Sequence, residues 1–93
     1  MSVTVQAMSR PRLARLVRLE WDQVRESHVL LAPEGVLVLN QTGATILRLC
    51  DRERTVVEIV EELRAEYDRV NGDEVREFLG RLAAKRWVEV GDG

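Results

Sequence analysis

Apolar and polar positions follow a two-residue period in the first half of the chain and helical spacing in the second half. Residues 16–21 alternate between apolar and charged side chains, which predicts a half-buried strand. Two more strands are predicted over 27–32 and 36–39, and the Pro-Glu-Gly sequence between them is typical of a short hairpin turn. The first half therefore predicts a three-stranded antiparallel meander.

Two helix starts carry recognisable caps. Asn40 is placed to cap a helix over 41–50, where Gly43 indicates close packing against a strand. Thr55 and Glu58 form a capping box, and apolar residues then recur at helical spacing opposite a row of glutamates. The second helix is therefore expected to bury its apolar face and to leave its acidic face in solvent.

A third helix is predicted over 73–86 and is expected to bury Val75, Phe78, Leu79 and Leu82. A short closing strand or extended tail over 87–90 follows it. The fold class is α+β: a small winged helix-turn-helix-like domain with a three-stranded antiparallel sheet followed by three helices. We expect a single domain over 13–90, a flexible arm over 1–12 and a frayed tail over 91–93.

Composition narrows the function classes. The chain has 93 residues, a net charge of −2 and a pI near 5.4, which does not favour a nucleic-acid binder. Residues 73–90 carry equal numbers of basic and acidic side chains, which is unusual for a recognition helix. DNA binding by a winged helix nevertheless remains an alternative to peptide binding at this point.

An ordered set of motifs over 30–63 resembles the core signature of the coenzyme PQQ synthesis protein D family. A Leu-Leu pair precedes Pro-Glu-Gly, an apolar strand ends in Leu-Asn, and an acidic turn leads to an Arg-Thr-Val helix start. The residues that carry the resemblance are Leu30, Leu31, Pro33, Glu34, Gly35, Leu39, Asn40, Thr42, Gly43, Ile46, Leu47, Leu49, Asp51, Arg54, Thr55 and Val56. Arg52 departs from the pattern, because the family commonly has Gly after this Asp.

The resemblance implies a peptide chaperone without chemistry of its own. In proteins similar to this one, a PqqA-like precursor peptide adds a strand beside the third strand, against the third helix. It is then presented to a PqqE-like radical SAM enzyme in pyrroloquinoline quinone biosynthesis. Carried onto this chain, the peptide-binding residues are Val36, Leu37, Val38 and Leu39 on the strand, and Arg76, Leu79, Gly80 and Ala83 on the helix.

Helical projection of residues 73–87 also shows a second face beside the core stripe, made of Arg76, Gly80, Ala83, Ala84 and Trp87. Its small side chains are compatible with a furrow beside a strand edge, where a peptide is added by β-augmentation. From the spacing alone, close packing of helix and sheet is the favoured interpretation. The resemblance favours the furrow.

No other chemistry stands out in the sequence. Cys50 is expected to be a buried, inert thiol and His28 a surface or cross-strand residue, so neither metal nor cofactor is expected. Neither a membrane span nor a signal peptide is recognised, and the cytoplasm is the expected compartment. An open edge strand is compatible with a homodimer. A carrier of a late quinone intermediate is a weaker alternative, since aromatic residues make up only 4% of the chain.

Overall fold

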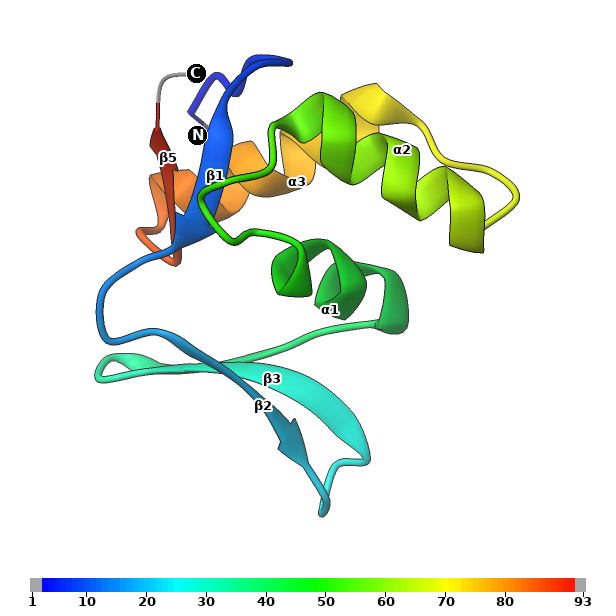
Figure 1. Ribbon diagram of the computed structural model, residues 1–93. Helices are drawn as coiled ribbons and strands as arrows, with labels where there is room; N and C mark the ends of the chain where they lie inside the picture. The colour runs from blue at the N-terminus through cyan, green and yellow to red at the C-terminus, as the bar shows by residue number, and fades with distance from the viewer. Residues whose placement is uncertain (1–2, 92–93) are drawn as a thin grey trace.

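The computed structural model describes residues 3–91. Helices α2 and α3 lie on one side of α1, and the β2–β3 hairpin lies on the other side (Figure 1). The elements in chain order are β1 (Arg10–Leu13), β2 (Arg18–Asp22), β3 (Ser27–Ala32), β4 (Gly35–Val38), α1 (Gln41–Arg48), α2 (Val56–Glu66), α3 (Gly72–Ala84) and β5 (Val88–Gly91). The predicted meander and the three helices are therefore confirmed.

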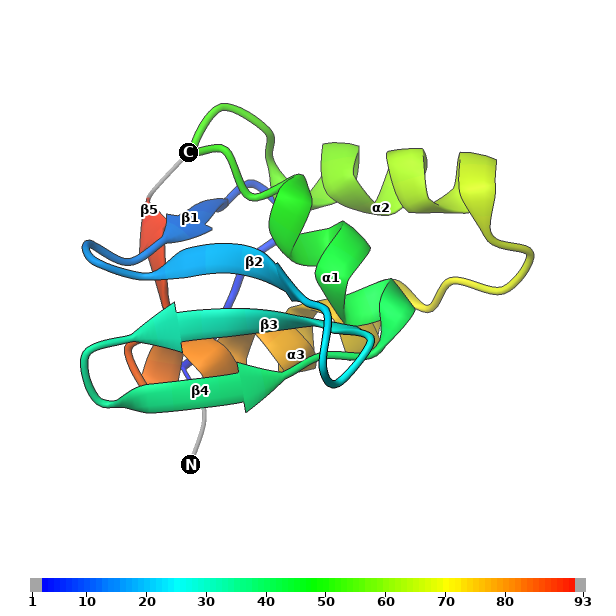
Figure 2. The ribbon, with the colours of Figure 1, turned by 90° about the horizontal axis from the view of Figure 1, so that it is seen from below.

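The meander forms an antiparallel sheet of order β2-β3-β4 (Figure 2). Ala32 pairs with Gly35, so Pro33 and Glu34 alone make the turn between β3 and β4. Trp21 pairs with His28 across β2 and β3, and their rings meet edge to face at 5.0 Å between centroids. This contact is the cross-strand role expected for His28.

The predicted caps are present. The Asn40 side chain accepts a hydrogen bond from the Gly43 amide at 2.7 Å, which begins α1. Thr55 and Glu58 bond reciprocally at the start of α2, so two otherwise unpaired amides are satisfied there. Gly43 does not pack against a strand as predicted: a Cβ on it would lie 3.0 Å from Oδ1 of Asn40, its own cap, and 3.2 Å from Cζ of Phe78 on α3.

The core lies between the sheet and the three helices. Its largest fully buried side chains are Leu30 from β3, Leu47 from α1, Ile59 and Leu63 from α2, and Leu79 from α3. Each of these elements therefore contributes to one continuous apolar cluster.

The prediction of a flexible arm over 1–12 is wrong for residues 3–12, because these residues pack onto the domain. β1 pairs with β5, from Arg10 with Gly91 to Leu13 with Val88, and forms a second, two-stranded sheet. Val5 is only 6% exposed and belongs to the core. The prediction failed because the pairing joins the two ends of the chain and leaves no local pattern. The remainder of the expected arm and Asp92–Gly93 of the expected tail lie outside the described residues.

The N-terminal segment, which we define as residues 3–9, also closes the start of α2. The amides of Val56 and Val57 donate to the carbonyls of Ser9 and Ala7 at 3.0 and 3.1 Å. Amides in the first turn of a helix have no partner within the helix, so these bonds complete the cap made by Thr55 and Glu58. Sequence positions far from α2 thus help to determine where it begins.

Candidate functional site

β4 is an edge strand with one unpaired side. Among the described strands it pairs with β3 alone, in a register that places Val38 opposite Val29 and Leu37 opposite Leu30. The Leu39 amide donates to the His28 carbonyl at 2.9 Å. Because backbone groups of successive residues point to opposite sides of an antiparallel strand, Leu37 and Leu39 bond toward β3, and Val36 and Val38 direct their N–H and C=O groups to the open edge.

The side chains of β4 separate in the same alternating way. Leu39 is buried and Leu37 half-buried, and both belong to or pack against the core. Val36 and Val38 are 50% and 51% exposed. The strand is therefore held by its inner face, while its outer face and its open edge are accessible to another chain.

A groove separates this edge from α3. Figure 2 shows α3 behind β3 and β4, running in the opposite direction to β4. The groove is lined by Leu37, Val38, Leu39 and Asn40 on one side and by Phe78, Arg81, Leu82, Lys85 and Trp87 on the other. Positions 78, 81, 82 and 85 form one stripe of the helix, because they are spaced by three and four residues.

The stripe has a deep part and a rim. Leu82 is buried and Phe78 half-buried, so they make an apolar floor together with Leu37 and Leu39. Arg81 and Lys85 are exposed and stand at the edge of the floor. The groove thus offers an apolar base, a positively charged rim and an unpaired strand edge.

The structure places the predicted helix residues elsewhere. The carbonyl of Gly80 accepts a hydrogen bond from the Val3 amide at 3.0 Å, and Gly80 is buried on the side of the N-terminal segment. Ala83 lines a separate depression with Val3 and residues of β5. Arg76 is paired with Asp73 on its own helix. The prediction that Gly80 and Ala83 face β4 is therefore wrong in geometry, and Leu79 is fully buried in the core.

Phe78, Arg81, Leu82 and Lys85 were missed as groove residues because Phe78 and Leu82 fitted the core stripe. The signal was present in the sequence. Cations follow Phe78 at i+3 and i+7, so one helix face carries apolar and basic side chains together. A core-facing stripe that becomes basic along one side marks the boundary between a core and an accessible groove.

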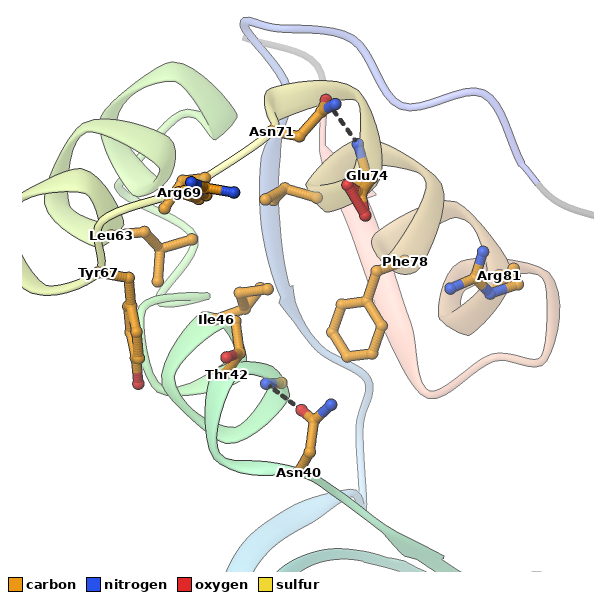
Figure 3. A pocket seen from close by; sticks show the side chains of 13 residues that line it. Asn40, Thr42, Ile46, Leu63, Tyr67, Arg69, Asn71, Glu74, Phe78 and Arg81 are labelled. Carbon is orange, nitrogen blue, oxygen red and sulfur yellow. Dashed lines mark hydrogen bonds between the residues drawn. The ribbon is translucent and has the colours of Figure 1, made fainter.

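A second pocket continues from the groove toward α1 and the end of α2. It shares Asn40, Phe78 and Arg81 with the groove and adds Tyr67 and Arg69. Figure 3 shows the Phe78 ring directed from α3 toward the start of α1, with Asn40 below it and Arg81 on the opposite side from Ile46. An extended ligand that passes the Asn40 end of the groove would meet this pocket next.

The shifted pKa values of Cys50 and Asp51 have structural causes. Burial raises the pKa of the Cys50 thiol to about 12, and its Sγ donates to the Ile46 carbonyl at 3.2 Å. The expected buried thiol is confirmed, and a protonated thiol is a poor nucleophile. The Asp51 carboxylate accepts hydrogen bonds from the backbone amides of Arg54 and Glu53, and these bonds lower its pKa. The carboxylate therefore caps the turn that leads to α2.

Residues 3–91 contain neither a cluster of metal-binding side chains nor a membrane-spanning helix. In this part of the chain, His, Cys, Asp and Glu side chains nowhere gather in a group of three or more that is able to hold a metal ion. None of its helices combines the length and the apolar character needed to cross a membrane.

The chain is similar to PqqA binding proteins over most of its length. A PqqA binding protein of Rahnella aquatilis is 32% identical over 88 residues, which cover 92% of this chain and 93% of that protein. A PqqA binding protein of Methylococcus capsulatus is 38% identical over 78 residues, covering 82% of this chain and 83% of that protein.

A solved structure agrees with the fold. The solution NMR structure of the PqqD truncation of Methylobacterium extorquens PqqCD matches with a TM-score of 0.69 and 40% sequence identity, covering 85% of this chain and 87% of that chain. It represents a functional, stand-alone recognition element for ribosomally synthesised and post-translationally modified peptides. The family model of coenzyme PQQ synthesis protein D (PqqD) matches residues 27–88, from β3 to the first residue of β5. The chain belongs to the PqqD family.

Proposed function

We propose that this chain binds a PqqA-type precursor peptide by strand addition along β4, with peptide side chains in the groove between β4 and α3. The observation that carries the proposal is the unpaired edge of β4 beside an apolar floor. Backbone bonds to Val36 and Val38 would provide affinity, and the floor would select side chains at alternate positions. Relatives from Rahnella aquatilis and Methylococcus capsulatus are PqqA binding proteins, which supports this assignment of the peptide.

The proposed role is to hold the peptide for another enzyme. A peptide strand paired with β4 has its second edge unpaired, so its backbone stays extended and accessible to a PqqE-like radical SAM enzyme. The described residues of this chain supply binding groups at the groove, and the chemical step belongs to that partner. The outer face of β4, with Val36 and Val38 half-exposed, remains available beside the bound peptide.

Val38→Pro tests strand addition directly. Proline removes the outward N–H of Val38 but no bond of the β3–β4 ladder, and edge strands tolerate proline at such positions. Losing this bond and leaving a peptide carbonyl unpaired together cost about 2 kcal/mol, so affinity should fall by roughly 30-fold in calorimetry with the PqqA peptide of Methylococcus capsulatus. The unfolding midpoint should change little.

Val38→Thr is the matched control, because it keeps the amide and nearly the same shape. It should bind the peptide as the unmodified chain does. Equal affinity of the proline and threonine variants would refute strand addition at β4. An open edge also pairs with copies of itself, so sedimentation velocity at the same concentrations will show whether a homodimer competes with the peptide.

A further inference from the structure

The two cations on the rim of the groove lack carboxylate partners within the described residues. Ion pairs within 4 Å occupy Arg12, Arg18, Arg25, Arg54 and Arg76, and neither Arg81 nor Lys85 takes part in one. Glu77 precedes Arg81 by one helical turn but does not pair with it. Among residues 3–91, no acidic side chain lines the groove. In a chain with net charge −2, this rim is a local positive site.

The spacing of the two cations matches that of an added strand. Residues four apart on a helix are separated by about 6 Å along its axis. Residues two apart on a strand are separated by about 6.6–6.8 Å and point to the same side. Since α3 runs alongside the β4 edge, an extended peptide in the groove would pass both cations with side chains at i and i+2 (Figure 2).

The depth of the groove separates two sets of peptide positions. Phe78 and Leu82 lie in the floor, whereas Arg81 and Lys85 are exposed above it. Side chains of a strand alternate between two faces, so those directed to the floor should be apolar. The intervening side chains would point to the open side of the groove, where the exposed Arg81 and Lys85 stand at the rim.

We infer that the groove is specific for a peptide segment in which apolar side chains alternate with carboxylates at i and i+2, and that Arg81 and Lys85 bind these carboxylates. The inference rests on the proposed function and adds the chemical class of the segment. Arg provides a bidentate contact to a carboxylate and Lys a point charge, so the pair reads charge and spacing together.

The competing role of these cations is structural. Positive side chains near the C-terminus of a helix stabilise it through the helix dipole, and Arg81 and Lys85 lie at that end of α3. Arg64 holds the equivalent place in the last turn of α2, is exposed and does not line the groove. Arg64→Gln is therefore the matched control for loss of charge at a helix end.

The test measures binding of the Methylococcus capsulatus PqqA peptide, with each acidic residue changed in turn to Gln, to the unmodified chain and to three variants. Arg81→Gln and Lys85→Gln should each weaken binding by up to about fivefold at low salt, the double variant should lose more than either, and Arg64→Gln should change affinity less than twofold. A Gln at either of two peptide positions, i and i+2, should weaken peptide binding to the unmodified chain. The same peptide changes should not weaken binding to the double variant. Added salt should reduce the difference.

Lys85 is the one lysine of the chain, which gives a second readout. A carbodiimide should join its amine to a single peptide carboxylate, identified by mass spectrometry, and the Gln form of that peptide should give no such product. Lys85→Arg should keep the affinity and lose the cross-link. Unchanged affinity of the double variant, or equal losses for all peptides, would overturn the inference while leaving strand addition intact. Absence of binding by the unmodified chain, or full binding by Val38→Pro, would instead refute the proposed function.

Discussion

One long face of α3 is covered by the chain itself, and the other lines an open groove. On one face, Gly80 and Ala83 lie under the N-terminal segment, and the Val3 amide bonds directly to the Gly80 carbonyl. On the other face, Phe78 and Lys85 line an open groove beside the unpaired edge of β4. The chain fills the first face with its own backbone and leaves the second face without a partner among the described residues.

This difference reverses the usual inference from small residues. Glycine lets another backbone approach a helix closely, and here the approaching backbone belongs to the same chain. The open face keeps larger side chains, which would form the wall and floor of a groove for the alternating side chains of the proposed peptide. Small residues therefore mark the covered face, and a mixed apolar and basic stripe marks the accessible one.

Val5→Asp should have the largest effect on stability. Val5 is 6% exposed, so the variant loses the burial of a Val side chain, about 1.5–3 kcal/mol, and adds the cost of a buried carboxylate. We expect the free energy of unfolding to fall by about 3 kcal/mol or more, measured by urea denaturation. Peptide affinity of the folded fraction should stay within twofold.

Val36→Asp is the matched control on β4, where the same substitution meets a half-exposed position. Its stability should fall by less than about 1 kcal/mol, the span of strand propensities. Similar losses for the two variants would show that the N-terminal segment contributes little, and the contrast between the two faces would then fail.

Hydrogen exchange should separate the faces amide by amide. In the free chain the Val3 amide, bonded to Gly80, should be protected, whereas the amides of Val36 and Val38 should exchange as open-edge groups. Peptide at 100 times its dissociation constant should slow exchange at these two β4 amides by up to about 100-fold, or 2.7 kcal/mol. Leu37 already bonds to β3 and serves as the internal control. Added protection at Val3 alone would place the peptide on the wrong face.

Gly80→Leu should cost stability rather than binding. Gly80 is buried beneath the N-terminal segment, and overpacking costs about 1–3 kcal/mol, partly offset by a gain of up to about 1 kcal/mol in helix propensity. We expect a net loss of about 1–2 kcal/mol in thermal unfolding with peptide affinity unchanged. Ala84→Leu, at an exposed position of the same helix, should shift stability by less than about 0.5 kcal/mol. If Gly80→Leu lost peptide binding and had a raised unfolding midpoint, the peptide would bind at Gly80 and not at the groove beside β4.

Much of the fold was predictable because its signals are local. The Asn40 cap, the capping box at Thr55 and the β3–β4 turn depend on side chains within a few residues, and each formed as predicted. The predicted strand over 36–39 is also the edge strand of the sheet. The turn before this strand and the helix cap after it were therefore sufficient to locate the strand of the candidate site in the sequence.

The helix half was not predictable in the same way, because helical spacing defines faces but not their neighbours. The pairing of Arg10 with Gly91 joins opposite ends of the chain, and Pro11 in β1 interrupts any alternating pattern. Without that pairing, the N-terminal segment had no predicted place, and the small face of α3 was assigned to β4. Contacts of high sequence separation determine which face stays open.

Arg52→Gly should have the smallest effect, and it concerns the position where this chain departs from the usual Gly of its family. Arg52 has φ of +74°, a left-handed conformation that costs an L-residue about 1–2 kcal/mol, whereas Gly adopts it freely. Because Gly also loses more entropy on folding, the net gain should be about 0.5–1 kcal/mol, or roughly 2–8 °C in the unfolding midpoint. The Arg52 amide bonds to the Pro11 carbonyl at 3.0 Å and belongs to the covered side of the molecule. Peptide affinity should therefore not change.

Arg52→Ala is the control, because it removes the side chain but keeps the strained conformation. It should leave the free energy of unfolding within about 0.5 kcal/mol of the unmodified chain. An equal gain in both variants would assign the effect to the Arg side chain and not to the backbone.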